Sequence, residues 1–355
     1  MLIFIIIFCL LIPGFFFNGK SIYSFFFLLV VLVVLALFAG FRGDIDNDYN
    51  SYLTIFEVIK KPSDYFTDYA TFAYLEPFYY LIPAFYKLLP FDSYVLLFIF
   101  FAFLGVGFKL LSIWKLSGNI GLAVITYFSF FFVLHEMTQI RIGIASGILL
   151  ISLTMIKERK IFSFITTVLF ASCFHYTAIL FLPIYFLDSE KINKKIWAGF
   201  LIVPLILYVL KIDFIQLVSA LSFGIFAEKL KTYQDMFELG QFSEKVNILN
   251  VRILIQMILT SLFLFYADFL QSKNKYTILL LKLLILSITF FILFTSLPVF
   301  AFRFQELFGV VQIILYPFIY YIVKEKYFGT FAVIFLAFLT LLFNLYYLQL
   351  LKPYF

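Results

Sequence analysis

The chain has 355 residues, of which 64% are hydrophobic and only 13% are charged, and its mean hydropathy is +1.07. Soluble globular domains carry about 25% charged residues, so this composition excludes a soluble protein and indicates one that crosses a membrane several times. The net charge of +6 comes largely from lysines in short loops, so it reports orientation in the membrane rather than binding of nucleic acid. The two cysteines, Cys9 and Cys173, lie in apolar runs, which argues against a disulfide framework.

Ten apolar segments approach the length of about 20 residues that a spanning helix needs. They are residues 2–17, 21–41, 93–113, 119–135, 140–156, 196–212, 249–269, 277–297, 304–323 and 328–348. We predict that the first is a retained helix, because it lacks the basic start and small-residue cleavage site of a signal peptide.

The apolar stretch 161–189 is long enough for one tilted span or for two short ones. Basic motifs flank it on both sides, KERK at 157–160 and EKINKK at 190–195. Because positively charged loops favour the cytoplasmic side, both motifs belong there and the chain between them must cross an even number of times. We therefore predict two short helices that meet at an outer turn around His175.

The aromatic stretch 73–90 contains Glu76 and three prolines and is short for a span. Counting it as a crossing would move KERK to the outside, so we predict an interfacial or re-entrant segment along the outer face. The result is an all-α integral membrane fold with about twelve transmembrane helices and both termini outside. Residues 1–355 then form a single polytopic membrane domain, whose longer segments 42–92 and 213–248 are extracytoplasmic.

The predicted topology separates the two kinds of basic residue. Lysines dominate the cytoplasmic loops, whereas four of the five arginines and both histidines fall at outer helix ends. These residues are Arg42, Arg141, Arg252, Arg303, His135 and His175. Positive charge is normally depleted on the outer side, and arginine suits bidentate binding of phosphate. The set therefore predicts a site for an anionic lipid headgroup, above all a pyrophosphate.

Several of these residues also have a purely structural interpretation. Arg252 can anchor a helix at the membrane interface. Arg303 can form an ion pair with Glu306 one helical turn later. His135 and Glu136 can form a polar turn between two spans.

Arg141 is harder to explain structurally. It begins an apolar helix in which Gly143, Ser146 and Gly147 permit close approach of a neighbouring helix. A charge buried in a membrane is costly and usually functional, so a functional role is favoured. His175, by contrast, can also satisfy the carbonyls of its own turn.

The chain offers no strong metal site. Its two histidines do not have the spacing of metal ligands. The aspartates of residues 44–48 have the D-x-D-x-D spacing with which a calcium-binding EF-hand loop begins. Such a loop also needs Gly at its sixth and Glu at its twelfth position. Counting from Asp44, those positions hold Tyr49 and Ile55. We therefore expect neither a metal nor a cofactor.

Four motifs, in order along the chain, resemble those of the EpsG family of exopolysaccharide proteins, which is related to the Wzy-type polymerases of O-antigen and capsule synthesis. FRGDIDNDYNSYLTIFE (41–57) is similar to the family segment after the second helix, and MTQIRIGIASGILLIS (137–152) to its NQIRQGIA helix. CFHYTAILFLPIYFL (173–187) and FRFQELF (302–308) are similar to later family segments.

The resemblance implies a multi-pass glycan polymerase of the GT-C type. Such an enzyme transfers a growing glycan from undecaprenyl pyrophosphate to a newly flipped lipid-linked unit. Its expected partners are undecaprenyl-pyrophosphate-linked oligosaccharides, membrane lipid and a chain-length regulator. It would lie in the bacterial cytoplasmic (inner) membrane, with its active site facing the periplasm or the cell exterior.

For this chemistry we predict a cationic site for the donor. Negative charge develops on the leaving pyrophosphate, so preorganised cations would stabilise the transition state. Arg141 and Arg303 are the predicted clamp, with Arg42 assisting. Tyr49 and Glu76 complete the predicted substrate-binding residues.

The acceptor hydroxyl must also lose its proton to a base. Asp44, Asp48 and His135 are the candidates, while His175 either binds the donor phosphate or acts as the base instead. The family pattern usually has one acidic residue before its tyrosine. Asp48 aligns best with that residue, and the choice among the three aspartates stays open.

Other functions are compatible with parts of this pattern. A ligase or a single-addition lipid-linked glycosyltransferase would differ from a polymerase only in its product. An acyltransferase is disfavoured because both histidines are predicted outside, away from a cytosolic acyl donor. A lipid-linked glycan flippase usually has internal repeats and charges near mid-span, whereas here no repeat is evident and the charges are predicted at one membrane face.

Overall fold

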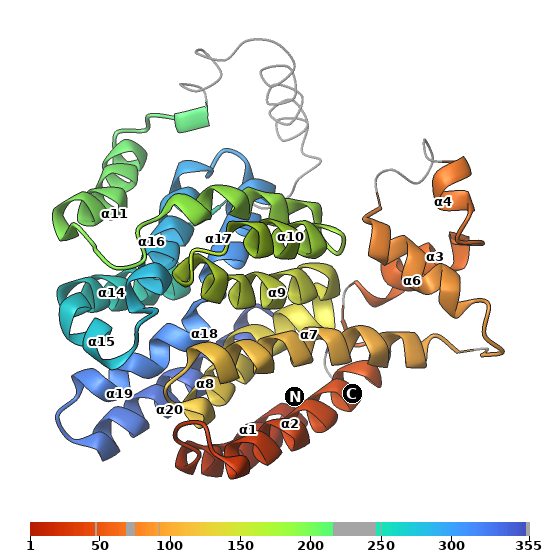
Figure 1. The fold of residues 1–355 in the computed structure, drawn as a ribbon, viewed down its shortest axis with the longest axis horizontal. Helices are drawn as coiled ribbons and strands as arrows, with labels where there is room; N and C mark the ends of the chain where they lie inside the picture. Colours follow the sequence, from red (N-terminus) through yellow and green to blue (C-terminus); the bar gives the residue numbers. More distant parts are fainter. Residues whose placement is uncertain (47, 69–74, 92, 216–245, 249, 353–355) are drawn as a thin grey trace. The chain divides into compact units, whose positions relative to one another are not determined.

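The computed structural model describes residues 1–46, 48–68, 75–91, 93–215, 246–248 and 250–352 (Figure 1). Most of the predicted extracytoplasmic segment 213–248 lies outside the described residues, and so do parts of the segment 42–92. All regular secondary structure in the described ranges is helical, which confirms the predicted all-α membrane fold.

The chain divides into two compact units, residues 1–187 with 316–355, and residues 188–315. The helices of the first unit are α1 (Leu2–Leu11), η1 (Ile12–Phe16), α2 (Ile22–Gly40), α3 (Tyr49–Val58), α4 (Asp64–Thr67), α6 (Pro77–Tyr86), α7 (Val95–Leu116), α8 (Ile120–Tyr127), η2 (Phe128–Thr138), α9 (Ile140–Lys157), α10 (Ile161–Ser172), η3 (Tyr176–Phe186), η4 (Tyr316–Phe318), α19 (Ile319–Ile322), α20 (Lys326–Leu342) and η5 (Phe343–Tyr347). Those of the second unit are α11 (Lys194–Val209), α14 (Val251–Phe265), α15 (Ala267–Lys273), α16 (Thr277–Leu293), α17 (Pro298–Gly309) and α18 (Gln312–Leu315).

Six helical runs in the described residues are long and apolar enough to cross a membrane. They are Ile22–Gly40, Val95–Leu116, Ile120–Thr138, Ile140–Lys157, Pro298–Ile322 and Lys326–Tyr347. The pair α14 and α15, bent by 79°, makes a seventh if it is counted as one span. The remaining predicted spans coincide with shorter apolar helices. The structure is therefore that of a multi-pass membrane protein, and the count of about twelve crossings stays a prediction.

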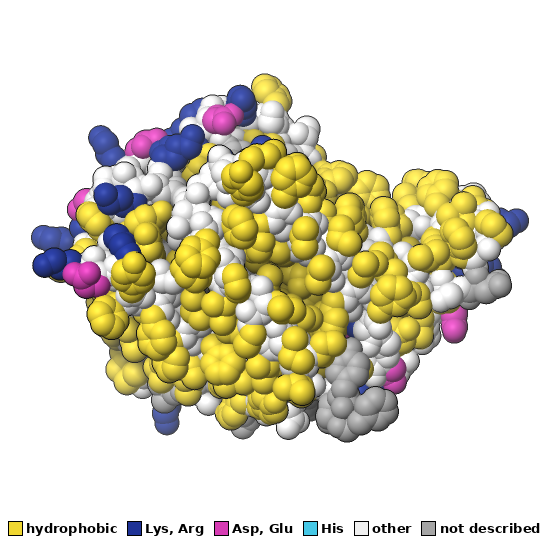
Figure 2. Space-filling view, turned by 90° about the horizontal axis from the view of Figure 1, so that it is seen from below, with side chains coloured by type: hydrophobic (Ala, Val, Ile, Leu, Met, Phe, Trp, Pro, Cys, Tyr) yellow, Lys and Arg dark blue, Asp and Glu magenta, His cyan; other side chains and the backbone are white. Residues whose placement is uncertain are grey.

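The outer surface of the helices explains why so apolar a chain is needed. Large hydrophobic side chains are exposed along α2, α11 and α20, where a soluble protein would place charge. Figure 2 shows a face on which hydrophobic side chains predominate. In contrast, every residue of the span Ile120–Thr138 is buried. Within the first unit, α7 and α20 pack against this buried run, so its entire circumference is covered by protein.

Two predictions about short segments can be compared with the structure. The stretch 161–189 forms two short helices, α10 and η3, that meet at a turn containing His175, as predicted. The aromatic stretch 73–90 forms α6, whose ten residues extend about 15 Å, half of the roughly 30 Å hydrocarbon core. The helix is therefore too short to span alone, and its position along the membrane surface stays a prediction.

Candidate functional site

Three segments of the first unit meet at the carboxylate of Glu76. Arg141 Nη1 lies 2.7 Å from Glu76 Oε2, and His175 Nδ1 lies 2.8 Å from Glu76 Oε1. Only 3% of the Glu76 side chain is exposed, whereas 30% of Arg141 and 11% of His175 are. The structure therefore joins three residues that the sequence predicted for substrate binding, and we call them the Glu76 cluster.

Two hydrogen bonds hold the start of α6 and the residues before it against the turn that carries His175. The Phe78 N–H donates to the Cys173 carbonyl over 2.9 Å, and the Tyr176 hydroxyl donates to the Leu75 carbonyl over 2.9 Å. Pro77 occupies the first position of α6, where its fixed φ suits a helix start and its missing N–H costs nothing. Glu76 is consequently the extended residue that precedes the helix, with its side chain directed at the turn.

Arg141 lies at the wrong end of a helix for a cation. It is the second residue of α9, where the helix dipole favours negative charge. Two groups offset this cost: the Glu76 carboxylate and the ring of Tyr79, whose centre lies 4.6 Å from the guanidinium carbon. A cation held in this way is positioned by its neighbours rather than by its own helix.

Glu76 is a carboxylate that stays ionised. Burial acts to raise its pKa, but the hydrogen bond from His175 and the charge of Arg141 outweigh burial, so the pKa of Glu76 is lower than its ordinary value of 4.5. An ionised carboxylate can only accept hydrogen bonds, so His175 donates through Nδ1–H. In a neutral imidazole this arrangement places the lone pair on Nε2.

This lowered pKa predicts how stability depends on pH. A carboxyl group with a lowered folded-state pKa stabilises the fold above its unfolded-state pKa, and the contribution is lost as the pH falls through the folded-state pKa. We expect the wild-type melting temperature, relative to that of Glu76→Gln, to fall when the pH is lowered from neutrality to below 4.5. Parallel pH profiles in a thermal unfolding assay would contradict this assignment.

Arg42 is sequestered in a separate ion pair. Its Nε lies 2.7 Å from Asp46 Oδ2, and both side chains are completely buried. Nη1 donates to the Ala39 carbonyl over 3.0 Å, and the guanidinium carbon lies 4.5 Å from the centre of the Phe98 ring. Burial raises the pKa of Asp46, and the charge of Arg42 opposes that effect. In the structure Arg42 thus ties the end of α2 to the following loop.

The other predicted acids and Tyr49 lie on the loop after α2 and at the start of α3. Asp44 is half exposed and lies 2.8 Å from Lys352 Nζ, and this hydrogen bond lowers the pKa of Asp44. Asp48 precedes the first residue of α3, and its backbone N–H donates to Asp46 Oδ1. The Tyr49 ring stacks on Phe98 with the ring centres 5.0 Å apart.

We expect Asp44→Asn to leave chain extension unchanged, because the carboxylate is already engaged by Lys352 and by the amide of Asn50. The product ladder of cells that express this variant tests the expectation. Loss of long chains at a normal protein level would instead support Asp44 as the base.

His135 and Glu136 do not form the polar turn that the sequence allowed. Both are buried within η2, a π-helical stretch that continues to Thr138. His135 Nδ1 lies 3.3 Å from the Ser146 hydroxyl. Glu136 Oε1 lies 2.6 Å from the ammonium of Lys109, a residue of α7 that the sequence analysis did not single out. A lysine inside the apolar run 93–113 was the missed signal for this buried pair, and the clustering of charges at one membrane face stays a prediction.

The remaining arginines lie in the second unit. Arg303 Nη1 lies 3.6 Å from Glu306 Oε2 within α17, the i, i+3 ion pair that the sequence allowed, and a third of its side chain is exposed. Arg252 is the second residue of α14.

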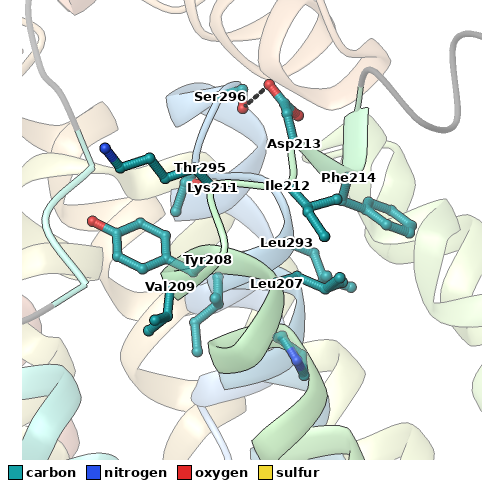
Figure 3. A pocket seen from close by; sticks show the side chains of 12 residues that line it. Leu207, Tyr208, Val209, Lys211, Ile212, Asp213, Phe214, Leu293, Thr295 and Ser296 are labelled. Carbon is teal, nitrogen blue, oxygen red and sulfur yellow. Dashed lines mark hydrogen bonds between the residues drawn. The ribbon is translucent and has the colours of Figure 1, made fainter.

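The second unit also contains a cavity that no predicted site residue lines (Figure 3). It has a volume of about 410 Å³ and lies beside the end of α11 and the residues that follow α16. Asp213 and Ser296, which form a 2.6 Å hydrogen bond, line the cavity together with Lys211, Leu207 and Leu293. The polar residues that follow the apolar run 196–212 were the signal available in the sequence.

No group of three or more His, Cys, Asp or Glu side chains in the described ranges could hold a metal ion.

Fold and site together define a multi-pass helical membrane protein with a charged cluster built from three distant segments. The chain belongs to the EpsG family, whose family model matches residues 24–355, nearly the whole chain. This family is associated with Wzy-type polymerases, which makes the chain a polysaccharide polymerase-like membrane protein. No curated protein and no solved structure matches the chain.

Proposed function

We propose that this protein polymerises the repeat units of a surface polysaccharide as a glycosyltransferase of the GT-C type. It transfers the growing glycan from undecaprenyl pyrophosphate to a new lipid-linked repeat unit. The reaction takes place on the outer face of the bacterial cytoplasmic membrane, with a chain-length regulator as a further partner. Family membership supports the class of reaction and lipid-linked saccharides as the substrates.

The observation that carries the proposal is the Glu76 cluster. It presents an arginine with a partly exposed side chain next to an imidazole that a buried carboxylate orients. These are the two components that glycosyl transfer from a pyrophosphate needs, a cation for the leaving group and a base for the acceptor. In this arrangement the carboxylate orients the histidine, and the histidine accepts the proton of the attacking hydroxyl, as in other sites that activate a nucleophile.

In the proposed step the acceptor hydroxyl of the new unit attacks the anomeric carbon of the growing glycan. The bond from that carbon to the pyrophosphate oxygen breaks, and its electron pair leaves with undecaprenyl pyrophosphate. The hydroxyl proton passes to Nε2 of His175, while Arg141 stabilises the charge on the leaving pyrophosphate. Glu76 holds both groups through its two oxygens.

Arg303 is a separate candidate for phosphate contact in the second unit, because a third of its side chain is exposed despite the long contact with Glu306. Arg42 is a weaker candidate for direct phosphate contact, because Asp46 and the Ala39 carbonyl already bind its buried guanidinium.

A flippase for lipid-linked glycans is the second candidate. The buried pair of Lys109 and Glu136 favours it, because transporters often carry charges inside their helices. A ligase or single-addition transferase remains a chemical variant of the main proposal.

Proteoliposomes that contain the purified protein and a defined lipid-linked repeat unit separate these functions. The proposal predicts products of many units on undecaprenyl pyrophosphate. Products of one transfer only would indicate a ligase or single-addition enzyme. Movement of the lipid-linked unit across the bilayer without any longer product would overturn the proposal in favour of a flippase.

A further inference from the structure

A buried ion pair lies between α7 and η2 in the first unit. Lys109 Nζ lies 2.6 Å from Glu136 Oε1, and the two side chains are 0% and 1% exposed. The Tyr127 hydroxyl donates to the same oxygen over 3.1 Å. Burying two charges costs several kcal/mol per ion, and charges inside membrane helices usually serve a function. The proposed glycosyl transfer does not use this pair directly, so another role is needed.

The backbone around the pair leaves no spare room. A Cβ added to Gly105 of α7 would lie 1.9 Å from Glu136 Oε2, and one added to Gly143 of α9 would lie 2.4 Å from the carbonyl oxygen of His135. Glycines at these two positions therefore allow α7, η2 and α9 to approach closely enough for the ion pair to form.

The ammonium of Lys109 connects the two sides of a hinge. Gln139, with φ −98° and ψ 61°, separates the π-helical η2 from α9. Lys109 Nζ binds Glu136 before this hinge and the Gly143 carbonyl after it, each over 2.6 Å. One buried cation thus fixes the angle between two helices, and π-helical stretches such as η2 are frequent at functional sites.

In the sequence, Arg141 lies between Glu136 and Gly143, the two residues that the Lys109 ammonium contacts. It is two residues after the hinge and two before Gly143, in the first turn of α9. A rotation of that turn would move the guanidinium relative to Glu76 and Tyr79. We propose that Lys109 and Glu136 are positioning residues for Arg141, an inference that rests on the proposed function of Arg141.

Gly105→Ala tests the inference without altering any charge, and Gly107→Ala is its matched control on the same helix. A Cβ at Gly105 would displace the Glu136 carboxylate, whereas one at Gly107 meets only Leu32 Cδ1 at an ordinary 3.7 Å. We expect kcat for chain extension to fall about 100-fold in Gly105→Ala, the loss typical of a misplacement of about 1 Å. KM and all values for Gly107→Ala should stay unchanged.

A second readout does not depend on activity. Phenylglyoxal modifies accessible guanidinium groups, and peptide mass spectrometry gives its rate at each arginine. In Gly105→Ala we expect faster modification of Arg141 but an unchanged rate at Arg252. An unchanged rate at Arg141 would overturn the positioning role. Faster modification with normal chain extension would leave that role intact and contradict the proposed function of Arg141 instead.

If Gly105→Ala does not fold, the double variant Lys109→Met/Glu136→Met provides the same comparison. Replacing both partners of a buried pair by hydrophobic residues of similar volume is often tolerated, whereas replacing one is not. The double variant removes the charged bond to the Gly143 carbonyl, so Arg141 should again be modified faster than in wild type. A wild-type rate there would overturn the inference.

Discussion

Replacing Arg141 by alanine should slow chain extension by about 100- to 1000-fold, the usual cost of removing one preorganised donor of an electrostatic site. Arg141 is the cation of the Glu76 cluster and its side chain is partly exposed, so its loss removes the positive partner that the cluster would offer the departing pyrophosphate. Glu76 keeps its hydrogen bond to His175, so the variant should still fold. Cells that express it should contain single lipid-linked units in place of long chains, which gel electrophoresis of the glycan shows directly.

Arg252→Ala is the control for this experiment, because it removes an arginine that has no part in the proposed machinery. It should produce a normal ladder at a comparable protein level. Arg141→Lys should restore part of the activity, since it keeps the charge but loses the planar fork that binds phosphate oxygens in pairs. A normal ladder in Arg141→Ala would refute the clamp.

Replacing His175 by glutamine should lower kcat by about 100- to 10,000-fold, the range of general base catalysis. Glutamine can still donate a hydrogen bond to Glu76, so the buried carboxylate stays partnered while the basic nitrogen is lost. Initial rates of chain extension in proteoliposomes measure the effect.

The other histidine provides the matched variant. His135→Gln changes the same residue type at a buried position that contacts Ser146. We expect a lower melting temperature but a kcat close to wild type. The reverse result, loss of kcat in His135→Gln but not in His175→Gln, would transfer the base to His135.

The helices were largely predictable because a membrane-spanning segment must be hydrophobic along its entire length of about 20 residues. Each of the ten predicted spans coincides with a helix or a run of helices. Their lengths were less predictable, because bends and π- or 3₁₀-helical stretches depend on packing that hydropathy does not report. The 79° bend between α14 and α15 is one example, and the π-helical η2 is another.

The members of the Glu76 cluster were predictable, but their contacts were not. The positive-inside rule assigned the lysine-rich loops to the cytoplasm. This assignment in turn predicted that Glu76, Arg141 and His175 lie on the same, outer side of the membrane. The hydrogen bonds join residues 65 and 99 positions apart, and only the tertiary fold determines such distances.

The buried pair of Lys109 and Glu136 shows where sequence reasoning failed. One lysine in an otherwise apolar run does not disqualify a span, and its partner lies 27 positions away next to a predicted turn. The mean hydropathy of the segment stays high, so it does not reveal a single lysine. The structure reveals the pair because a buried charge needs a partner, and the glycines Gly105 and Gly143 make room for that partner.

Chemical rescue of Arg141→Ala shows whether the guanidinium of the Glu76 cluster stabilises the leaving pyrophosphate. Purified Arg141→Ala protein in proteoliposomes is supplied with a lipid-linked repeat unit and increasing concentrations of guanidinium ion, kept below those that unfold the wild type. We expect chain extension to recover in a saturable manner, while His175→Gln shows no recovery. Equal stimulation of both variants, or no recovery in Arg141→Ala although it binds the lipid-linked unit, would contradict this expectation.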